Sequence, residues 1–344
     1  MVPTRLGGLG SGFGDYTEVA IELGKASGAT ALLYNMHASV TGALAGARDE
    51  LARSLGAPEE FFTERDRVLA AAASGAMYGV AISEAAAGSR LSRLQTSYRP
   101  DGEGFHITGT KVACSGAGHL DGYLVAARRE DSPEQMPVIS YLLVPGDAVI
   151  VDGEWDPLGM RSTASRGLIL DAWVPTEALV GGIEGLAVPL AYLMPQWLVA
   201  SYAAVYIGVA EGALAAAEEL LRDRSRTGPA VRGRLGRADA DLEAARLVVH
   251  HAAQLIDGQP GHPETNRWVY RAKLLAGDVV MSVAASVAEA CGLSALKRGS
   301  PIERCFRDAR LGAVMPPRSD VCADYLGATL LGLDPQSDLD EAPW

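Results

Sequence analysis

Hydrophobic and polar residues follow three different spacing patterns along the 344-residue chain. Residues 15–80 are rich in Ala, Leu and Glu, and their spacing is typical of helices. We expect helices over residues 15–28, 32–45 and 63–75, separated in part by a loop at Gly56-Ala57-Pro58. Asp15 and Thr63 are residue types that favour helix N-caps, and they are the expected caps of the first and third helices.

The spacing pattern changes between residues 80 and 180, where short apolar runs alternate with Gly, Pro and Asp turns. Asp101-Gly102 and Asp152-Gly153 are turn pairs of the kind found in hairpins. Closely spaced strands without intervening helices predict an antiparallel barrel or sandwich rather than a parallel sheet. The expected strands are residues 105–108, 123–127, 138–144, 149–151 and 168–174.

Residues 186–335 return to helical spacing. A mostly small and apolar stretch over residues 268–291 would suit a helix buried in a bundle or in a subunit interface. One helix face is indicated by a three- and four-residue repeat of Leu242, Ala245, Val249, Ala252 and Ile256. The order predicts an α+β protein with helices at 1–78, a central β-domain at 79–182 and a helical bundle at 183–344.

Composition and charge exclude several classes of function. The chain is 48% hydrophobic, so a large core is available, and its net charge of -12 argues against nucleic acid and against a basic membrane-surface helix. No uninterrupted apolar run predicts a membrane span, and the N-terminus lacks the order of a signal peptide. The four cysteines show no metal-ligand spacing. We therefore expect a cytoplasmic protein with reduced thiols and no metal site.

Five short motifs occur in order within about ninety residues. They are residues 83–89, residues 102–111, Ser115-Gly116-Ala117, residues 158–165 and Val174-Pro175. In this order and spacing they resemble the acyl-CoA dehydrogenase superfamily, and the resemblance extends from Pro3 to about Gly332. It implies N-terminal helices, a central antiparallel β-barrel or sandwich, and a C-terminal four-helix bundle. About fifty residues of the family's first two helices have no counterpart here.

The resemblance implies a flavoprotein that binds FAD. A flavin ring is flat and mostly apolar with one polar edge, so its site needs an apolar slot and a few well-placed donors. By position in the motifs, Ser83 would contact the pyrimidine edge of the ring and Ser89 the pyrophosphate. Ser115 would donate to the flavin N5 atom.

The C-terminal part carries further matches. Residues 224–228 are similar to a family segment whose arginine, here Arg224, grips the FAD pyrophosphate of a neighbouring subunit, as a planar guanidinium suits. Residues 301–310 closely match another family motif, for which a salt-bridged helix face is the plainer interpretation. Gly292 stands in the segment that contacts the neighbour's adenosine, although the usual glutamine is absent. The resemblance implies a homotetramer or a dimer.

The sequence departs from the family at the catalytic base. A dehydrogenase of this family removes a substrate α-proton with a buried glutamate while a hydride leaves to the flavin. Pro316 falls on the usual glutamate position, and the alternative position falls near Leu198 and Val199. Asp320 is the nearest acidic candidate, although its sequence position favours a helix cap. Ala113 replaces the aromatic residue that usually packs beside the flavin.

These departures leave three functions open. The leading interpretation is an FAD-dependent oxidoreductase that acts on an acyl-CoA or acyl-carrier thioester. A second is a monooxygenase of the same superfamily, which uses FMN or reduced flavin supplied by a reductase. His37 falls where those monooxygenases have an active-site histidine, although a structural role for His37 is slightly favoured. A third is an accessory subunit of a hetero-oligomeric acyl-CoA dehydrogenase, a subunit that lacks the catalytic base.

Overall fold

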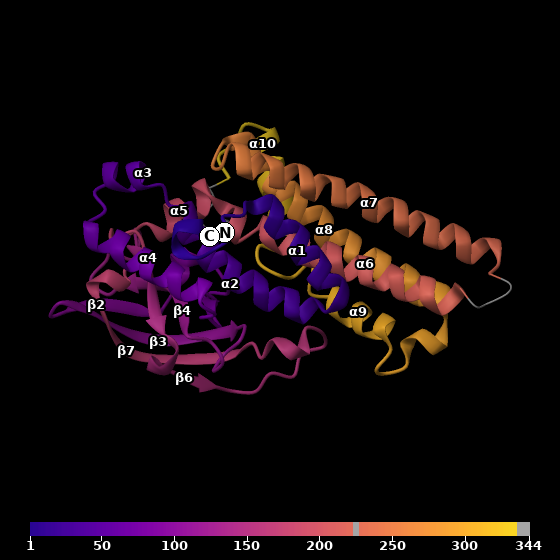
Figure 1. Cartoon of the computed structure of the whole chain (residues 1–344), viewed down its shortest axis with the longest axis horizontal. Helices are drawn as coiled ribbons and strands as arrows, with labels where there is room; N and C mark the ends of the chain where they lie inside the picture. The colour runs from indigo at the N-terminus through magenta and orange to yellow at the C-terminus, as the bar shows by residue number, and fades with distance from the viewer. Residues whose placement is uncertain (223–226, 336–344) are drawn as a thin grey trace.

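A computed structural model describes residues 1–222 and 227–335 of the chain (Figure 1). Four helices come first, a seven-stranded sheet follows, and the chain then returns to helices. The helices are α1 Phe13–Ala26, α2 Gly28–Gly46, α3 Asp49–Ser54, α4 Glu59–Ala73, α5 Ala187–Leu193, α6 Ala200–Arg222, α7 Pro229–Gly258, α8 Pro263–Cys291, α9 Pro301–Ala309 and α10 Ser319–Leu330. The strands are β1 Tyr78–Ala81, β2 Ser97–Asp101, β3 Gly104–Cys114, β4 Gly122–Arg129, β5 Ile139–Pro145, β6 Val149–Asp152 and β7 Arg166–Pro175.

The sheet is mostly antiparallel, as the closely spaced strands predict. β2 and β3 form the hairpin expected at Asp101-Gly102, and β3 pairs along its length with β7. β4 departs from this pattern, because β1 and β2 both pair with it in parallel while β5 covers its other side. The sheet is therefore mixed. The sequence did not indicate the parallel pairs because they join strands that are separated by long excursions of the chain.

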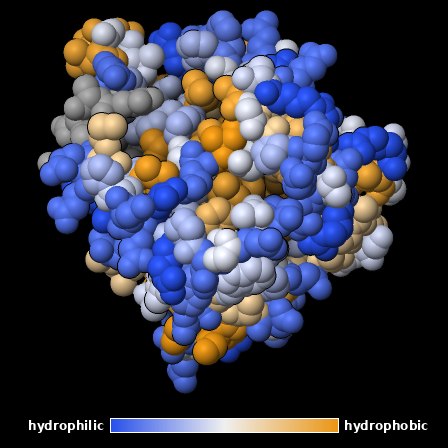
Figure 2. Space-filling model, turned by 90° about the vertical axis from the view of Figure 1, so that its left-hand side faces the viewer, coloured by the Kyte–Doolittle hydropathy of each residue, from blue (hydrophilic) through white to orange (hydrophobic). Residues whose placement is uncertain are grey.

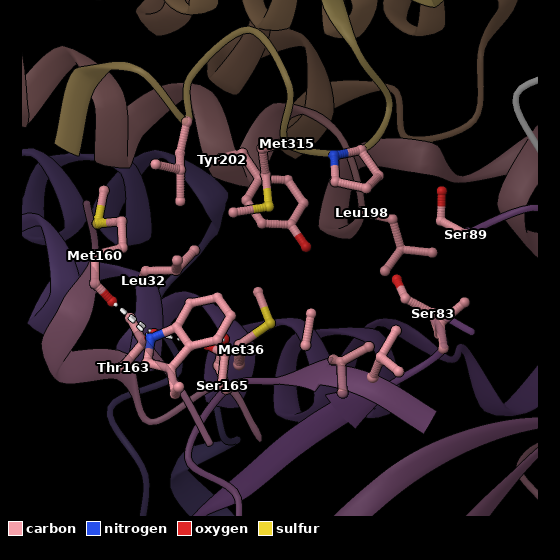
Figure 3. Close-up of a pocket in the computed structure, with 18 residues that line it drawn as sticks. Leu32, Met36, Ser83, Ser89, Met160, Thr163, Ser165, Leu198, Tyr202 and Met315 are labelled. Atoms are coloured by element: carbon pink, nitrogen blue, oxygen red, sulfur yellow. Dashed lines mark hydrogen bonds between the residues drawn. The ribbon is translucent and has the colours of Figure 1, made fainter. Parts of the chain in front are cut away.

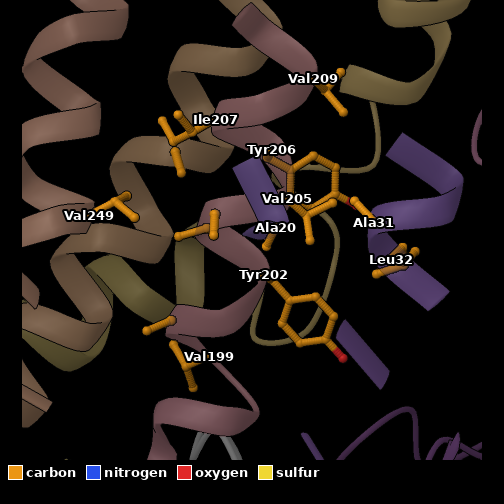
Figure 4. Packing of buried hydrophobic residues seen from close by; sticks show 14 of the residues in the cluster. Ala20, Ala31, Leu32, Val199, Tyr202, Val205, Tyr206, Ile207, Val209 and Val249 are labelled. Atoms are coloured by element: carbon orange, nitrogen blue, oxygen red, sulfur yellow. The ribbon is translucent and has the colours of Figure 1, made fainter. Parts of the chain in front are cut away.

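The bundle is built on α6, which is buried over most of its length. It packs against α1, α2, α8 and α9, so the N-terminal and C-terminal helices share one core (Figure 4). The crossing with α1 is close because a Cβ at Gly24 would lie 2.6 Å from the carbonyl oxygen of Val205. A Cβ at Gly208 would lie 2.3 Å from the carbonyl oxygen of Ile21, so both helices need glycine there.

The expected helices are present with shifted starts. Asp15 is not the N-cap of α1, because the helix begins earlier, at Phe13. The carboxylate of Asp15 instead accepts from the backbone N–H of Gly12, the residue before the helix. Thr63 is not the cap of α4, because that helix already begins at Glu59. The helix face predicted around Val249 is confirmed, since all five of its residues are buried on α7.

Two helical stretches are long and apolar enough to cross a membrane by length and composition, Pro195–Arg222 and Pro263–Cys291. In the first, 78% of the most apolar window is buried inside the fold, and in the second 50% is buried. The first stretch therefore lies mostly in the core of the bundle, whereas half of the second window lies outside it. Figure 2 shows the end of the molecule nearer the sheet, where apolar side chains gather in a hollow surrounded by polar ones.

Candidate active site

A cavity of about 170 Å³ lies where the sheet, α2 and the bundle meet (Figure 3). Its walls come from segments far apart in the chain, so it exists only in the folded molecule. One wall belongs to loops of the β-domain, and the other to α2, α6 and the segment after α9. The lining residues are Leu32, Met36, Val80, Ile82, Ser83, Ser89, Val112, Ala113, Ser115, Trp155, Met160, Thr163, Ser165, Leu198, Tyr202, Leu311, Met315 and Pro316.

The β-domain wall is shaped by unusual backbone. The register of β3 on β7 shifts between Lys111 and Cys114, and this bulge turns Ala113 into the cavity. Ala113, Met160 and Ala164 are the described non-glycine residues with positive φ, at 55°, 54° and 46°. Each such residue costs of order 1–3 kcal/mol, so it persists only where the surrounding structure imposes it. All three lie in or beside the lining, so the local strain is concentrated at this site.

Three hydroxyl groups on this wall form a chain. Thr163 donates to the carbonyl oxygen of Met160 at 2.8 Å, and this uses its single proton. The contact of 2.7 Å between Thr163 and Ser165 therefore has Ser165 as donor. The contact of 3.0 Å between Ser165 and Ser115 then has Ser115 as donor. A ligand acceptor beside Ser115 would compete for that one proton.

Ser83 and Ser89 also line the cavity, on the loop after β1. Neither hydroxyl has a hydrogen-bond partner among the described residues, and Figure 3 shows both beside the cavity. Both hydroxyls are free to bind a ligand. The structure thus brings Ser83, Ser89 and Ser115 together on one cavity, and their contacts to a flavin stay a prediction.

A buried ion pair supports the loop that carries these serines. The ammonium of Lys111 lies 2.8 Å from Oε1 of Glu84 and also donates to the carbonyl oxygen of Ile82. The carboxylate of Glu84 accepts two further bonds, from the backbone N–H groups of Gln95 and Thr96. Burial pushes the pKa of Glu84 upwards, but Lys111 and the hydrogen bonds outweigh it and lower the pKa. Glu84 is therefore ionised and fully paired.

Helix α9 holds the loop before β7. The buried carboxylate of Asp308 accepts from the backbone N–H of Met160 at 2.6 Å, and burial raises the pKa of Asp308. Arg307 donates to the carbonyl oxygen of Leu158 at 2.9 Å. The motif at residues 301–310 does contain the expected salt bridge, between Arg307 and Glu303. Its larger contribution is to fix the β-domain wall of the cavity.

The helical wall has different chemistry. Pro316 stands where the resemblance puts the usual catalytic glutamate, and Leu198 belongs to the pair Leu198-Val199 near the alternative position. Leu198 and Pro316 both line the cavity. Met315 beside Pro316 is also apolar. Among the described lining residues there is no Asp, Glu, His, Lys or Arg, and Tyr202 is the one titratable side chain. This wall therefore offers no carboxylate to remove a substrate proton.

The two candidate catalytic residues do not line the cavity. His37 lies on α2 with its ring stacked on Tyr78, and its Nδ1 atom accepts from the backbone N–H of Tyr78 at 3.2 Å. Burial lowers the pKa of His37 and favours the neutral ring that this bond requires. Asp320 is exposed in the first turn of α10 and pairs with Arg318 at 2.7 Å. Both side chains have local structural partners.

The remaining predicted cofactor residues lie elsewhere. Arg224 lies outside the described residues. Gly292 ends α8 with a φ of 75°, and an added Cβ would meet no atom within 4 Å. It does not line the cavity. In the described ranges, no group of three or more His, Cys, Asp or Glu residues is arranged to hold a metal ion.

Some lining residues were not anticipated as site residues from the sequence. Trp155 lies in the loop after β6, and its indole N–H donates to the carbonyl oxygen of Met160 at 3.2 Å. Tyr202 lies in the first turn of α6, and Leu198 lies in the turn just before that helix. Leu32 and Met36 are four residues apart and share a face of α2.

An apolar slot with hydroxyl groups along one wall, at the junction of a sheet and a helical bundle, suits the flat, mostly apolar flavin ring of a flavin-dependent oxidoreductase with an α+β fold. Residues 79–173 match the family model of the acyl-CoA dehydrogenase middle domain, and residues 200–315 match that of the C-terminal domain. The chain belongs to the acyl-CoA dehydrogenase superfamily. The predictions of the fold class and of this superfamily are confirmed.

Similar proteins cover nearly the whole chain. A putative acyl-CoA dehydrogenase of Bacillus subtilis is 28% identical over 95% of this chain and 84% of its own length. The 3-sulfinopropanoyl-CoA desulfinase of Variovorax paradoxus is 29% identical over 96% of this chain and 83% of its own length. Among solved structures, a dibenzothiophene monooxygenase from a Paenibacillus species, in complex with FMN and indole, is 26% identical. Its TM-score is 0.80, with 96% of this chain and 86% of that chain covered.

Proposed function

We propose that this chain binds FAD in the cavity between the sheet and the bundle and oxidises or reduces an acyl thioester there. We further propose that its reaction does not begin with removal of a proton by a protein carboxylate. The observation that carries the second statement is the helical wall, where Leu198 and Pro316 stand in place of a base. The cofactor assignment is supported by the free hydroxyl groups of Ser83 and Ser89 and by the chain of hydroxyls at Ser115.

The chemistry of the lining fits a flavin. Apolar side chains of the β-domain wall would cover one face of a flat ring, and the hydroxyl groups would meet its polar edge. The helical wall would then face the substrate. When bound, a flavin would supply the redox chemistry of the site. Ser115 would orient the ring by donating to its N5 atom, and the ties from Glu84 and Asp308 keep the surrounding loops in place.

An acyl thioester as the substrate is supported by the names of two similar proteins. The Bacillus protein is named for acyl-CoA dehydrogenation, and the Variovorax protein for removal of sulfinate from a CoA thioester. One superfamily therefore combines thioester substrates with more than one reaction. A chain without a carboxylate at the cavity is compatible with this range.

A monooxygenase is the second candidate. It is favoured by the same carboxylate-free cavity together with the similarity to the dibenzothiophene monooxygenase that was solved with FMN and indole. In that case the cofactor would be FMN or reduced flavin delivered by a reductase, and the substrate would be an apolar aromatic molecule. A homo-oligomer is proposed for either function, with the half-exposed α8 as the contact surface.

Anaerobic titration of the FAD-loaded protein with a panel of acyl-CoAs tests the leading proposal. We expect saturable changes in the flavin absorbance spectrum, with slow bleaching because no base is present. A spectrum unchanged by every acyl-CoA would overturn the thioester assignment. Turnover of an aromatic substrate that requires NAD(P)H, a flavin reductase and oxygen would then support the monooxygenase. A protein that takes up neither FAD nor FMN would contradict both functions.

A further inference from the structure

The helical wall of the cavity contains one polar side-chain atom among the described residues, the hydroxyl oxygen of Tyr202. The other side chains on this wall are apolar: Leu32, Met36, Leu198, Leu311, Met315 and Pro316. Figure 3 shows Tyr202 and Met315 on the side of the cavity opposite Thr163 and Ser165. A molecule bound between the two walls would therefore meet hydroxyl groups on the β-domain side and a single phenol on the other.

The phenol of Tyr202 is buried without a protein partner. The residue is 8% exposed, and its hydroxyl points into the cavity (Figure 3). Within residues 1–222 and 227–335 no hydrogen bond to this hydroxyl is present. The neighbouring phenol of Tyr16 does not supply one, because it is bonded to Asn35 at 2.6 Å and to the carbonyl oxygen of Ser201 at 2.9 Å. Tyr202 thus has a proton to donate and only the cavity to receive it.

The protonation state of this phenol is clear. Burial raises the pKa of Tyr202, so the hydroxyl keeps its proton at neutral pH and acts as a donor. A buried donor without an acceptor is costly, and an occupant that is apolar throughout would also exclude the water that could pair with it. The favourable occupant is therefore one that places an acceptor atom beside the helical wall.

We infer that Tyr202 is a substrate-binding residue whose hydroxyl donates a hydrogen bond to the carbonyl oxygen of the acyl thioester. This inference rests on the proposed thioester function and deepens it. A carbonyl group on an otherwise apolar acyl chain matches the wall, which is apolar except at this one donor. Tyr202 thereby selects ligands that carry an acceptor over ligands of the same shape that lack it.

The test compares two ligands that differ in the carbonyl oxygen, butyryl-CoA and its thioether analogue S-butyl-CoA. Their dissociation constants are measured by calorimetry, without oxygen, on the flavin-loaded wild type and on Tyr202→Phe. We expect the wild type to bind butyryl-CoA roughly ten- to hundredfold more tightly than S-butyl-CoA. In Tyr202→Phe this ratio should fall to within about threefold, because the donor is gone and the rest of the ring remains.

Tyr206→Phe is the matched control. Tyr206 lies one turn further along α6, and its buried hydroxyl also has no partner among the described residues. It packs in the core and does not line the cavity (Figure 4). This variant should keep the wild-type ratio and the wild-type flavin spectrum. If the wild type binds both ligands and Tyr202→Phe leaves their ratio unchanged, the role of Tyr202 is wrong while the thioester function stands. If the wild type binds neither ligand, the thioester function itself fails.

Discussion

The two walls of the cavity differ in how closely they follow the acyl-CoA dehydrogenase pattern. The β-domain wall has the expected serines, and it is fixed by the Glu84–Lys111 ion pair and by Asp308. The helical wall is lined by apolar side chains, and leucine and proline stand where the resemblance places a base. The wall that would bind the cofactor thus matches the acyl-CoA dehydrogenase pattern more closely than the wall that would face the substrate. Membership of the superfamily therefore defines the cofactor class better than it defines the reaction.

The largest expected effect comes from giving the helical wall the carboxylate that it lacks. In Leu198→Glu the new side chain would face an apolar cavity, where burial raises its pKa towards the range of a general base. General-base catalysis contributes roughly 10²- to 10⁴-fold, so anaerobic bleaching of the flavin by butyryl-CoA should accelerate by about that factor. The rate is measured by stopped-flow absorbance. Leu198→Gln has nearly the same shape as Leu198→Glu without the charge, so its flavin should bleach as slowly as in the wild type. Equal rates in the two variants would mean that the missing carboxylate does not limit the reaction.

The next largest effect tests the support of the β-domain wall. Lys111→Met would leave the buried carboxylate of Glu84 without its cation, which typically costs about 3–5 kcal/mol of stability. Chemical denaturation measures the loss. The double variant with Glu84→Gln should recover part of it, because the uncompensated charge is then also removed. Arg161→Ala, which breaks an exposed pair with Asp156, should change stability by less than about 1 kcal/mol. If Lys111→Met also lost less than about 1 kcal/mol of stability, the ion pair would not stabilise the β-domain wall.

The smallest effect concerns a single hydroxyl on the β-domain wall. Ser115→Ala removes the proposed donor to the flavin, but a flavin bond would in any case replace the bond that Ser115 makes to Ser165. We therefore expect the free energy of FAD binding to weaken by only about 1 kcal/mol, which is about a fivefold rise in the dissociation constant for FAD. Fluorescence titration of the apoprotein with FAD measures it, with the exposed Ser54→Ala as a control. Unchanged affinity and an unchanged flavin spectrum would show that Ser115 does not contact the ring.

Sequence patterns predicted the features that depend on local spacing. The buried face of α7 around Val249 and the serines of the β-domain motifs follow from residues close together in the chain. Features that depend on distant segments were not predicted. The parallel pairing of β4 and the tie between Asp308 and Met160 join residues far apart in sequence. Tyr202 was also missed, because a tyrosine on an apolar helix face looks like core until the neighbouring α2 and the segment after α9 are in place.

The bond from Asp308 to Met160 has a consequence for building hybrid enzymes from relatives of this chain. Its partners are 148 residues apart, one in the β-domain loop and the other on α9. Gly159 beside it needs the space, since a Cβ there would lie 2.3 Å from the carbonyl oxygen of Arg307. A crossover that exchanged the sheet alone would pair one parent's loop with the other parent's helix. The transferable unit is therefore the sheet together with α9, two pieces of chain inherited as one.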